Sequence, residues 1–354
     1  GGEMLKVWTR LALTSDDPVF HRIAENLSGV IRHYANAAGA PLDIERVTTL
    51  LLVIKPDRTG ELWADTAAVC LSILAKRAIA AGTAVFEHDI VDVTGMAFPH
   101  VDIGKDDKVI CLFRQDWRFG LYFNFNPDRD FNHDEFHRSL GSLYRSLKYR
   151  HIYDAIGRQE VFEKLVKAGW FPFAEIITSE FRELVQNCEA GFDLKDVEDK
   201  IIASFDEARL DRMLDRWLSK PHLAAREVVL RSAIRSFKAN DPVAVTKTVL
   251  TEIEGVLNAA YRASHHKGAK IKTLLKFAAE SAERKAGDPH TLLLPEAFAS
   301  YLKTRTYADF DPLAGGGDAG SRHAVGHGEA AADTYTQAAA LQALLTLDQL
   351  AFST

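Results

Sequence analysis

Apolar residues recur at helical spacing over residues 17–38, the first patterned segment of the chain. Asp17 and Pro18 favour a helix start, because an N-cap acceptor followed by proline suits the first turn of a helix. The apolar positions fall three or four residues apart and are Phe20, Ile23, Leu27, Ile31 and Tyr34. The pattern predicts one amphipathic helix here.

Short apolar runs separated by turns replace the helical pattern after residue 46. The run 47–54 is followed by a Pro-Asp-Arg-Thr-Gly turn, which is typical of two strands joined by a hairpin. Residues 65–81 carry apolar positions that favour a helix. The further candidate strands are 85–86, 90–93, 109–113 and 117–125. We expect an α/β domain over 1–130, built on a mainly antiparallel or mixed sheet.

Helical spacing dominates the chain after a break at 127–130. The stretches expected in a helical middle region, 131–240, are 132–168, 173–188, 195–218 and 222–238. Asp241 and Pro242 then start the first of four further blocks, which are 242–264, 269–286, 293–304 and 334–352. These blocks predict an antiparallel four-helix bundle over 241–354. The expected fold class is therefore α+β.

Composition narrows the classes of function. The chain has a formal net charge of −6, so nucleic-acid binding would need a local basic patch. Cys70, Cys111 and Cys188 lie far apart in the sequence, which suits a reducing cytoplasm better than a disulfide framework. No 18-residue apolar run is present, and we expect no membrane span. Walker, GxGxxG and GxSxG signatures are also missing, which disfavours common nucleotide-dependent and serine-hydrolase classes.

An arginine and a histidine separated by four residues lie near the C-terminal end, in the sequence Ser-Arg-His-Ala-Val-Gly-His-Gly at 321–328. A glycine-rich loop precedes them, and a Glu-Gly pair, Glu254 and Gly255, lies in the first block of the bundle. Together these features resemble the HEPN superfamily, in which Arg, a polar residue and then His after four to six residues mark the final helix. The resemblance covers 241–354.

This resemblance implies a metal-independent endoribonuclease without a cofactor, which cuts RNA as a homodimer formed through the C-terminal bundle. Many such proteins are toxins or phage-defence effectors, so an antitoxin or a regulatory ligand is a further expected partner. The N-terminal domain would then sense a ligand, recognise RNA or restrain the nuclease. A non-catalytic HEPN-containing protein that serves regulation, dimerisation and binding stays open as the alternative.

The residue types of the motif suit metal-free RNA cleavage on chemical grounds. The 2′-hydroxyl attacks the adjacent phosphate, and His327 would move a proton because imidazole titrates near neutral pH. The Arg322 guanidinium would hold two oxygens of the charged transition state. His323 would position the substrate or a partner residue. Glu254 would pair with Arg322 or orient His327.

Helix geometry restricts how this motif works. Positions five apart on an ideal helix point about 140° from each other. Arg322 and His327 therefore converge only at an irregular helix start or across a dimer. Gly326 and Gly328 favour the irregular start, because glycine tolerates non-helical backbone. The alternative is that the arginine and the histidines only cap the bundle or face solvent.

A basic stretch without an acid spans the junction of the first two bundle blocks. Such a stretch is suited to following an RNA backbone. A solvated turn and helix face is the alternative. The candidate RNA-binding residues are Arg262, Lys267, Lys270, Lys272 and Lys276.

His133 and His137 have the spacing of a zinc-protease helix motif. Asp134 stands where that motif has glutamate, and no third ligand follows in the sequence. We therefore expect no metal site, and a zinc hydrolase stays open as a third class of function.

Overall fold

The chain forms two compact units in a computed structural model that describes residues 8–308 and 317–354. The N-terminal unit comprises the described residues up to Ile73 together with Val93–Arg150, and the C-terminal unit comprises Leu74–Asp92 and His151–Thr354. One is built on a sheet and the other is mainly helical, as expected for an α+β protein. The borders expected at 130 and 240 differ from this division, because the helix after 130 packs on the sheet and the middle helices join the C-terminal unit.

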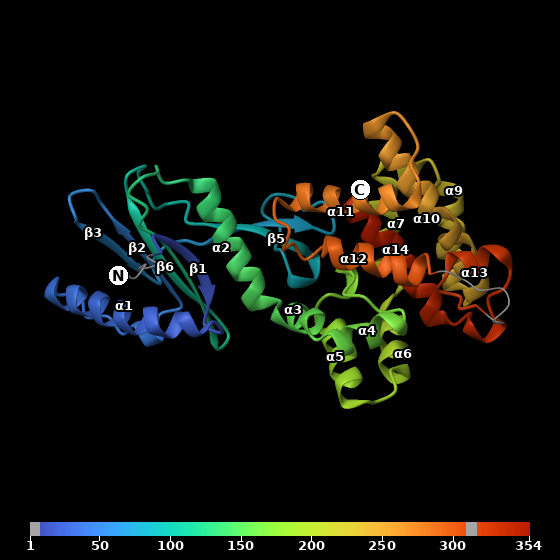
Figure 1. The fold of residues 1–354 in the computed structure, drawn as a ribbon, viewed down its shortest axis with the longest axis horizontal. Helices are drawn as coiled ribbons and strands as arrows, with labels where there is room; N and C mark the ends of the chain where they lie inside the picture. The colour runs from blue at the N-terminus through green and yellow to red at the C-terminus, as the bar shows by residue number, and fades with distance from the viewer. Residues whose placement is uncertain (1–7, 309–316) are drawn as a thin grey trace, which may run out of the picture. The chain divides into compact units, whose positions relative to one another are not determined.

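A five-stranded sheet forms the centre of the N-terminal unit (Figure 1). Its strand order is β1-β7-β6-β2-β3, and every neighbouring pair is antiparallel. The register brings Cys111 of the central strand opposite both Leu51 and Tyr122. The strands are β1 (Arg10–Thr14), β2 (Thr49–Ile54), β3 (Gly60–Ala64), β6 (Lys108–Gln115) and β7 (Arg118–Asn124).

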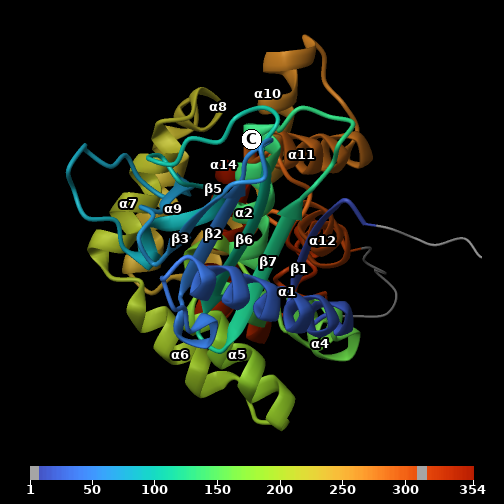
Figure 2. The ribbon, with the colours of Figure 1, turned by 90° about the vertical axis from the view of Figure 1, so that its left-hand side faces the viewer.

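Helices cover both faces of this sheet (Figures 1 and 2). Leu51, Cys111 and Tyr122 face α2 (His133–Lys148) in one apolar core. On the other face, Leu50 and residues of β6 and β7 pack against α1 (Pro18–Ala37). Because both faces are buried, β2 is an almost continuous apolar run and shows no polar alternation. The helix predicted over 17–38 is confirmed, with Asp17 accepting a hydrogen bond from the Val19 amide.

The helix predicted over 65–81 is wrong, because β4 (Cys70–Ala75) pairs there with β5 (Ile90–Ala97) in a two-stranded sheet. Exposed polar positions alternate with half-buried apolar ones at the start of β4, which is the period of a strand. The expected strand at 85–86 is also wrong, since those residues precede the short helix η2 (Glu87–Asp89).

The C-terminal unit is a helical assembly around one buried helix. That helix, α14 (Gln337–Ser353), is buried on all sides from Ala338 to Ser353. It contacts two helices of the expected bundle and three helices of the middle region. These are α10 (Pro242–His265) and α11 (Ile271–Ala286), and α6 (Lys195–Ser204), α7 (Glu207–Leu218) and α9 (Glu227–Lys238). The predicted bundle blocks are therefore present, but the middle region shares their core.

Helices make up most of this part of the chain. None of those within the described ranges is long and apolar enough to cross a bilayer. The first group is α3 (Arg150–Gly157), α4 (Gln159–Lys167), α5 (Ser179–Ala190), α6 (Lys195–Ser204), α7 (Glu207–Leu218), α8 (Pro221–Ala224) and α9 (Glu227–Lys238). The second group is α10 (Pro242–His265), α11 (Ile271–Ala286), α12 (Pro295–Tyr301), the π-helix η4 (Leu302–Thr306), α13 (Arg322–His327) and α14.

Candidate functional site

The Arg-His motif forms a short helix of its own, α13, and does not begin the final helix. The Ser321 side chain caps α13 by accepting a hydrogen bond from the Ala324 amide. Gly328 ends the helix with a positive φ of 76°, a conformation that glycine adopts without strain. Since α13 is helical from Arg322 to His327, the irregular start that we expected from Gly326 is wrong.

Arg322 pairs with Glu254 of α10, one of the two roles expected for that glutamate. The Arg322 Nη1 lies 2.9 Å from the Glu254 Oε2. The Arg322 and Glu254 side chains are 29% and 32% exposed, so the pair remains accessible to a ligand. This contact fixes the C-terminal motif against the Glu-Gly pair of the first bundle helix.

Tyr307 extends this cluster. The Arg322 Cζ lies 5.9 Å from the centre of the Tyr307 ring, and the His323 ring approaches the same ring edge-on at 6.3 Å between centroids. Burial, with a smaller contribution from Glu254, raises the pKa of Tyr307, so its hydroxyl keeps its proton at neutral pH. Within the described residues, the Tyr307 hydroxyl and the Arg322 Nε are buried and have no hydrogen-bond partner.

His327 lies apart from this cluster on its own helix. It is the last residue of α13 and is exposed, and it has no hydrogen bond or ion pair with another described residue. Five positions along a helix turn its side chain about 140° away from Arg322. One chain therefore presents the guanidinium and the imidazole on different sides of α13.

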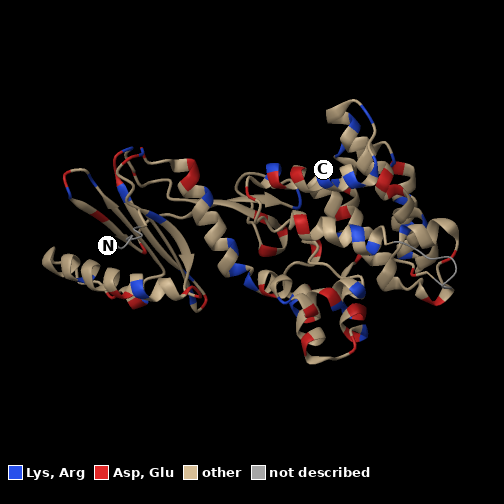
Figure 3. Cartoon of the chain, viewed as in Figure 1, with Lys and Arg blue, Asp and Glu red and all other residues tan. Residues whose placement is uncertain are grey.

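The candidate RNA-binding residues lie at the tip of the α10–α11 hairpin, and all of them are exposed. Figure 3 colours the lysines and arginines of the whole chain blue. Arg262 lies eight residues beyond Glu254 on α10, a rise of about 12 Å. Lys276 is within 3.5 Å of Glu280 on α11. The basic tip is thus separated from the Arg322 cluster by at least two helical turns.

The two histidines of α2, His133 and His137, have no third potential metal ligand beside them among the described residues. The ring centroids of His133 and His137 are 6.1 Å apart. In residues 8–308 and 317–354, no three His, Cys, Asp or Glu side chains gather into a set that could hold a metal ion.

A buried charge network in the C-terminal unit escaped sequence reasoning. Arg216 of α7 lies 2.7 Å from both Glu175 and Asp348, and the Trp217 indole donates to Asp348 at 2.7 Å. Burial raises the pKa of Asp348 to about 6, although the charge of Arg216 opposes this increase. An aspartate inside the leucine-rich final helix was the available signal, because a buried carboxylate requires a partner.

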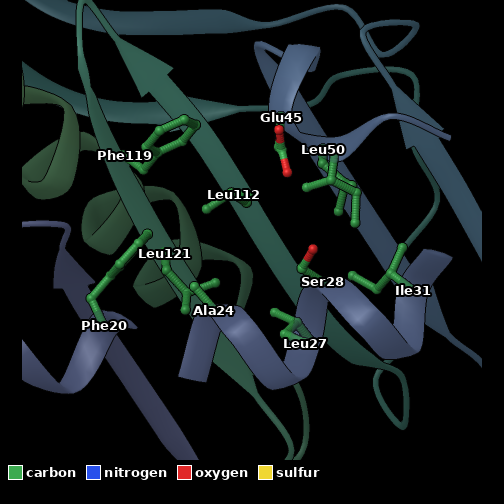
Figure 4. A pocket seen from close by; sticks show the side chains of 11 residues that line it. Phe20, Ala24, Leu27, Ser28, Ile31, Glu45, Leu50, Leu112, Phe119 and Leu121 are labelled. Atoms are coloured by element: carbon green, nitrogen blue, oxygen red, sulfur yellow. The ribbon is translucent and has the colours of Figure 1, made fainter. Parts of the chain in front are cut away.

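A small apolar cavity of about 140 Å³ lies between α1 and the sheet (Figure 4). Leu27 and Ile31 of α1 face Leu50 and Leu112 across it. Ser28 and Glu45 are its polar lining residues, so it offers volume for apolar groups and few polar anchors.

Comparison of the chain with protein-family models, with curated proteins and with solved structures gives no match.

Proposed function

We propose that this chain is a metal-independent RNA endonuclease of HEPN type that acts as a homodimer. The observation that carries the proposal is the ion pair between Arg322 and Glu254. It joins the two sequence features on which the HEPN resemblance rests, although they are 68 positions apart in the chain. The same resemblance underlies a cytoplasmic role in phage defence or as a toxin, restrained by an antitoxin or a regulatory ligand.

The chemistry assigns different tasks to the motif residues. Arg322 binds the scissile phosphate and stabilises the charge that develops on it. His327 transfers a proton between the 2′-hydroxyl and the leaving oxygen. Glu254 holds the guanidinium in place, and His323 positions the RNA beside Tyr307. The hairpin tip from Arg262 to Lys276 follows the RNA backbone.

A second copy of the chain brings an arginine and a histidine of the motif together, which one chain does not do. Because Arg322 and His327 diverge on α13, the proposed cleft combines the arginine of one protomer with the histidine of its partner. A two-fold axis near α13 produces two such composite pairs, since the same surface serves both protomers.

The divergence also favours the second candidate function, a non-catalytic binding and dimerisation protein. In that case the Arg322–Glu254 pair only stabilises the packing of α13 on α10. The two proposals differ in whether RNA is cut.

RNA cleavage tests the proposal directly. The purified chain is incubated with mixed RNAs in EDTA, beside the variants Arg322→Ala and His327→Ala. We expect cleavage by the parent and a loss of about a hundredfold in His327→Ala, the scale of a positioned acid–base group. The matched control is His290→Ala, an exposed histidine of the same unit outside the motif. Equal cleavage by the parent and His327→Ala would remove the catalytic assignment.

Mixing the two inactive variants tests the composite site. Arg322→Ala and His327→Ala chains that exchange form mixed dimers, in which one intact Arg-His pair is restored. We expect about a quarter of the parental rate, since half of the dimers are mixed and each carries one of two sites. A mixture as inactive as its components would place both residues of the pair on one chain and overturn the composite site.

A further inference from the structure

A basic cavity of about 710 Å³ lies in the C-terminal unit. No residue of the Arg322 cluster lines it. It is enclosed by residues 74–78, α7, α11 and the end of α14. Its charged lining consists of six cations and one acid. These side chains are Lys76, Arg77, Arg212, Arg216, Lys220, Lys285 and Asp215.

Ion pairs hold Arg77, Arg216 and Lys76, and the Lys285 amine donates to the carbonyl oxygens of Phe352 and Thr354. Arg77 binds Asp89 through two hydrogen bonds of 2.7 and 3.1 Å, and Arg216 is fixed by the buried network. Lys76 is only 9% exposed, and its nearest carboxylate oxygen is 4.0 Å away. Within the described residues, Arg212 and Lys220 have no ion-pair partner. The cavity thus has a rigid basic floor and two cations available to a ligand.

The acids that pair with part of this lining belong to a neighbouring cavity. That cavity, of about 450 Å³, shares Lys76, Arg77, Arg212 and Arg216 with the first. Its lining has four acids against five cations, the four shared ones and Arg209, whereas Asp215 is the one acid in the lining of the larger cavity. The acids of the smaller cavity are Asp89, Glu175, Glu180 and Asp206.

We propose that the larger cavity binds a small phosphate-bearing molecule of nucleotide size. Its volume lies within the usual range for small-molecule sites, and arginine forks match phosphate oxygens. Leu74, Ala78 and Phe352 supply an apolar wall, which suits a flat group attached to the phosphates. A strand of RNA is the less favoured occupant, because the cations are gathered around one cavity and do not follow an extended track.

The lowered pKa values of two lysines in the lining, Lys285 and Lys76, support an anionic ligand. Enclosure of its amine, together with the neighbouring Lys220, lowers the pKa of Lys285 to about 8. Burial likewise lowers the pKa of Lys76, in part against the attraction of Glu175. A bound phosphate would offset this desolvation and repulsion, since it adds negative charge beside both amines.

Binding to the full-length chain tests this site without reference to RNA cleavage. Titration calorimetry uses ADP and pyrophosphate as probes and adenosine as the uncharged comparison. The variant combines Arg212→Gln with Lys220→Gln, two side chains without partners whose loss leaves the buried network intact. The matched control combines Lys167→Gln with Arg235→Gln, two exposed cations of the same unit outside the cavity lining.

We expect ADP and pyrophosphate to bind, adenosine to bind at least about tenfold more weakly than ADP, and the cavity variant to lose about tenfold in ADP affinity. The control variant should bind ADP as the parent does. Absence of ADP and pyrophosphate binding at millimolar concentration, or equal ADP binding by the cavity variant, would overturn the proposal. RNA binding that requires Arg212 and Lys220 without any nucleotide binding would also overturn it.

Discussion

The pKa of a single side chain in the C-terminal unit depends on neighbours that other elements bring close to it. His222, which follows Pro221 at the start of α8, contacts the Thr354 hydroxyl at 3.0 Å. Burial first, and then Lys220, Lys285 and Arg226, lower its pKa to about 4. Sequence alone shows a histidine near basic residues; the extent of its burial follows from the fold.

The lowered pKa of His222 gives a pH dependence of stability with a definite sign. The unfolded chain binds a proton at His222 near pH 6.5 and the folded chain only near pH 4, so folding is weakened as the pH falls through this window. We expect His222→Gln to lose less free energy of unfolding than the parent between pH 7 and pH 5, measured by urea denaturation. His290→Gln, an exposed control, should keep the parental difference. Parallel curves for parent and His222→Gln would contradict this reading.

Individual elements were predictable where their own pattern was strong. The 17–38 helix has a cap and one apolar stripe, and β2, β6 and β7 are apolar runs between turns. The prediction for 65–81 was wrong because its few apolar residues fit the period of a helix as well as that of a strand. Pairing with β5 makes part of this segment a strand. Strand β1 carries too little pattern to be found before its partner β7 is known.

Gly141 of α2 lies so close to the backbone of Gly95 in β5 that no side chain fits between them. A Cβ at this position would lie 2.6 Å from the Gly95 Cα and 2.7 Å from its amide nitrogen. Because backbone cannot move aside as a flexible side chain does, we expect Gly141→Ala to cost about 2–3 kcal/mol of unfolding free energy. Gly29→Ala in the exposed face of α1 meets no atom within 4 Å and should gain about 0.5–1 kcal/mol. Urea denaturation of both variants measures the difference, and equal effects would refute the close-packing argument.

At the scale of the whole chain, buried charges connect distant segments of the C-terminal unit. Arg216 pairs with Glu175, 41 positions away, and with Asp348, 132 positions away. It also donates to the Lys76 carbonyl at 2.9 Å. These contacts tie the end of β4, the middle helices and α14 into one unit, which explains why the middle region shares the core of the C-terminal helices.

Removal of one charge from this network should destabilise the C-terminal unit strongly. Asp348→Asn leaves the buried Arg216 with less compensation, and we expect a loss of about 3–5 kcal/mol. Asp211→Asn is the matched control, because its ion pair with Lys238 is exposed and should contribute less than about 1 kcal/mol. Chemical denaturation compares the two variants. A loss in Asp348→Asn no larger than that of the control would show that the network is not a stabilising one.

The sequence by itself determined the local elements and the candidate chemistry. The helical and strand periods depend on residues close together in the chain, and the Arg-His motif and the Glu-Gly pair can be recognised in the sequence. Only the tertiary structure decided which residues distant in the sequence come into contact. It brings Arg322 to Glu254 and gathers six cations around one cavity. Such contacts depend on how helices far apart in the chain pack, and no local pattern encodes the distance between their side chains.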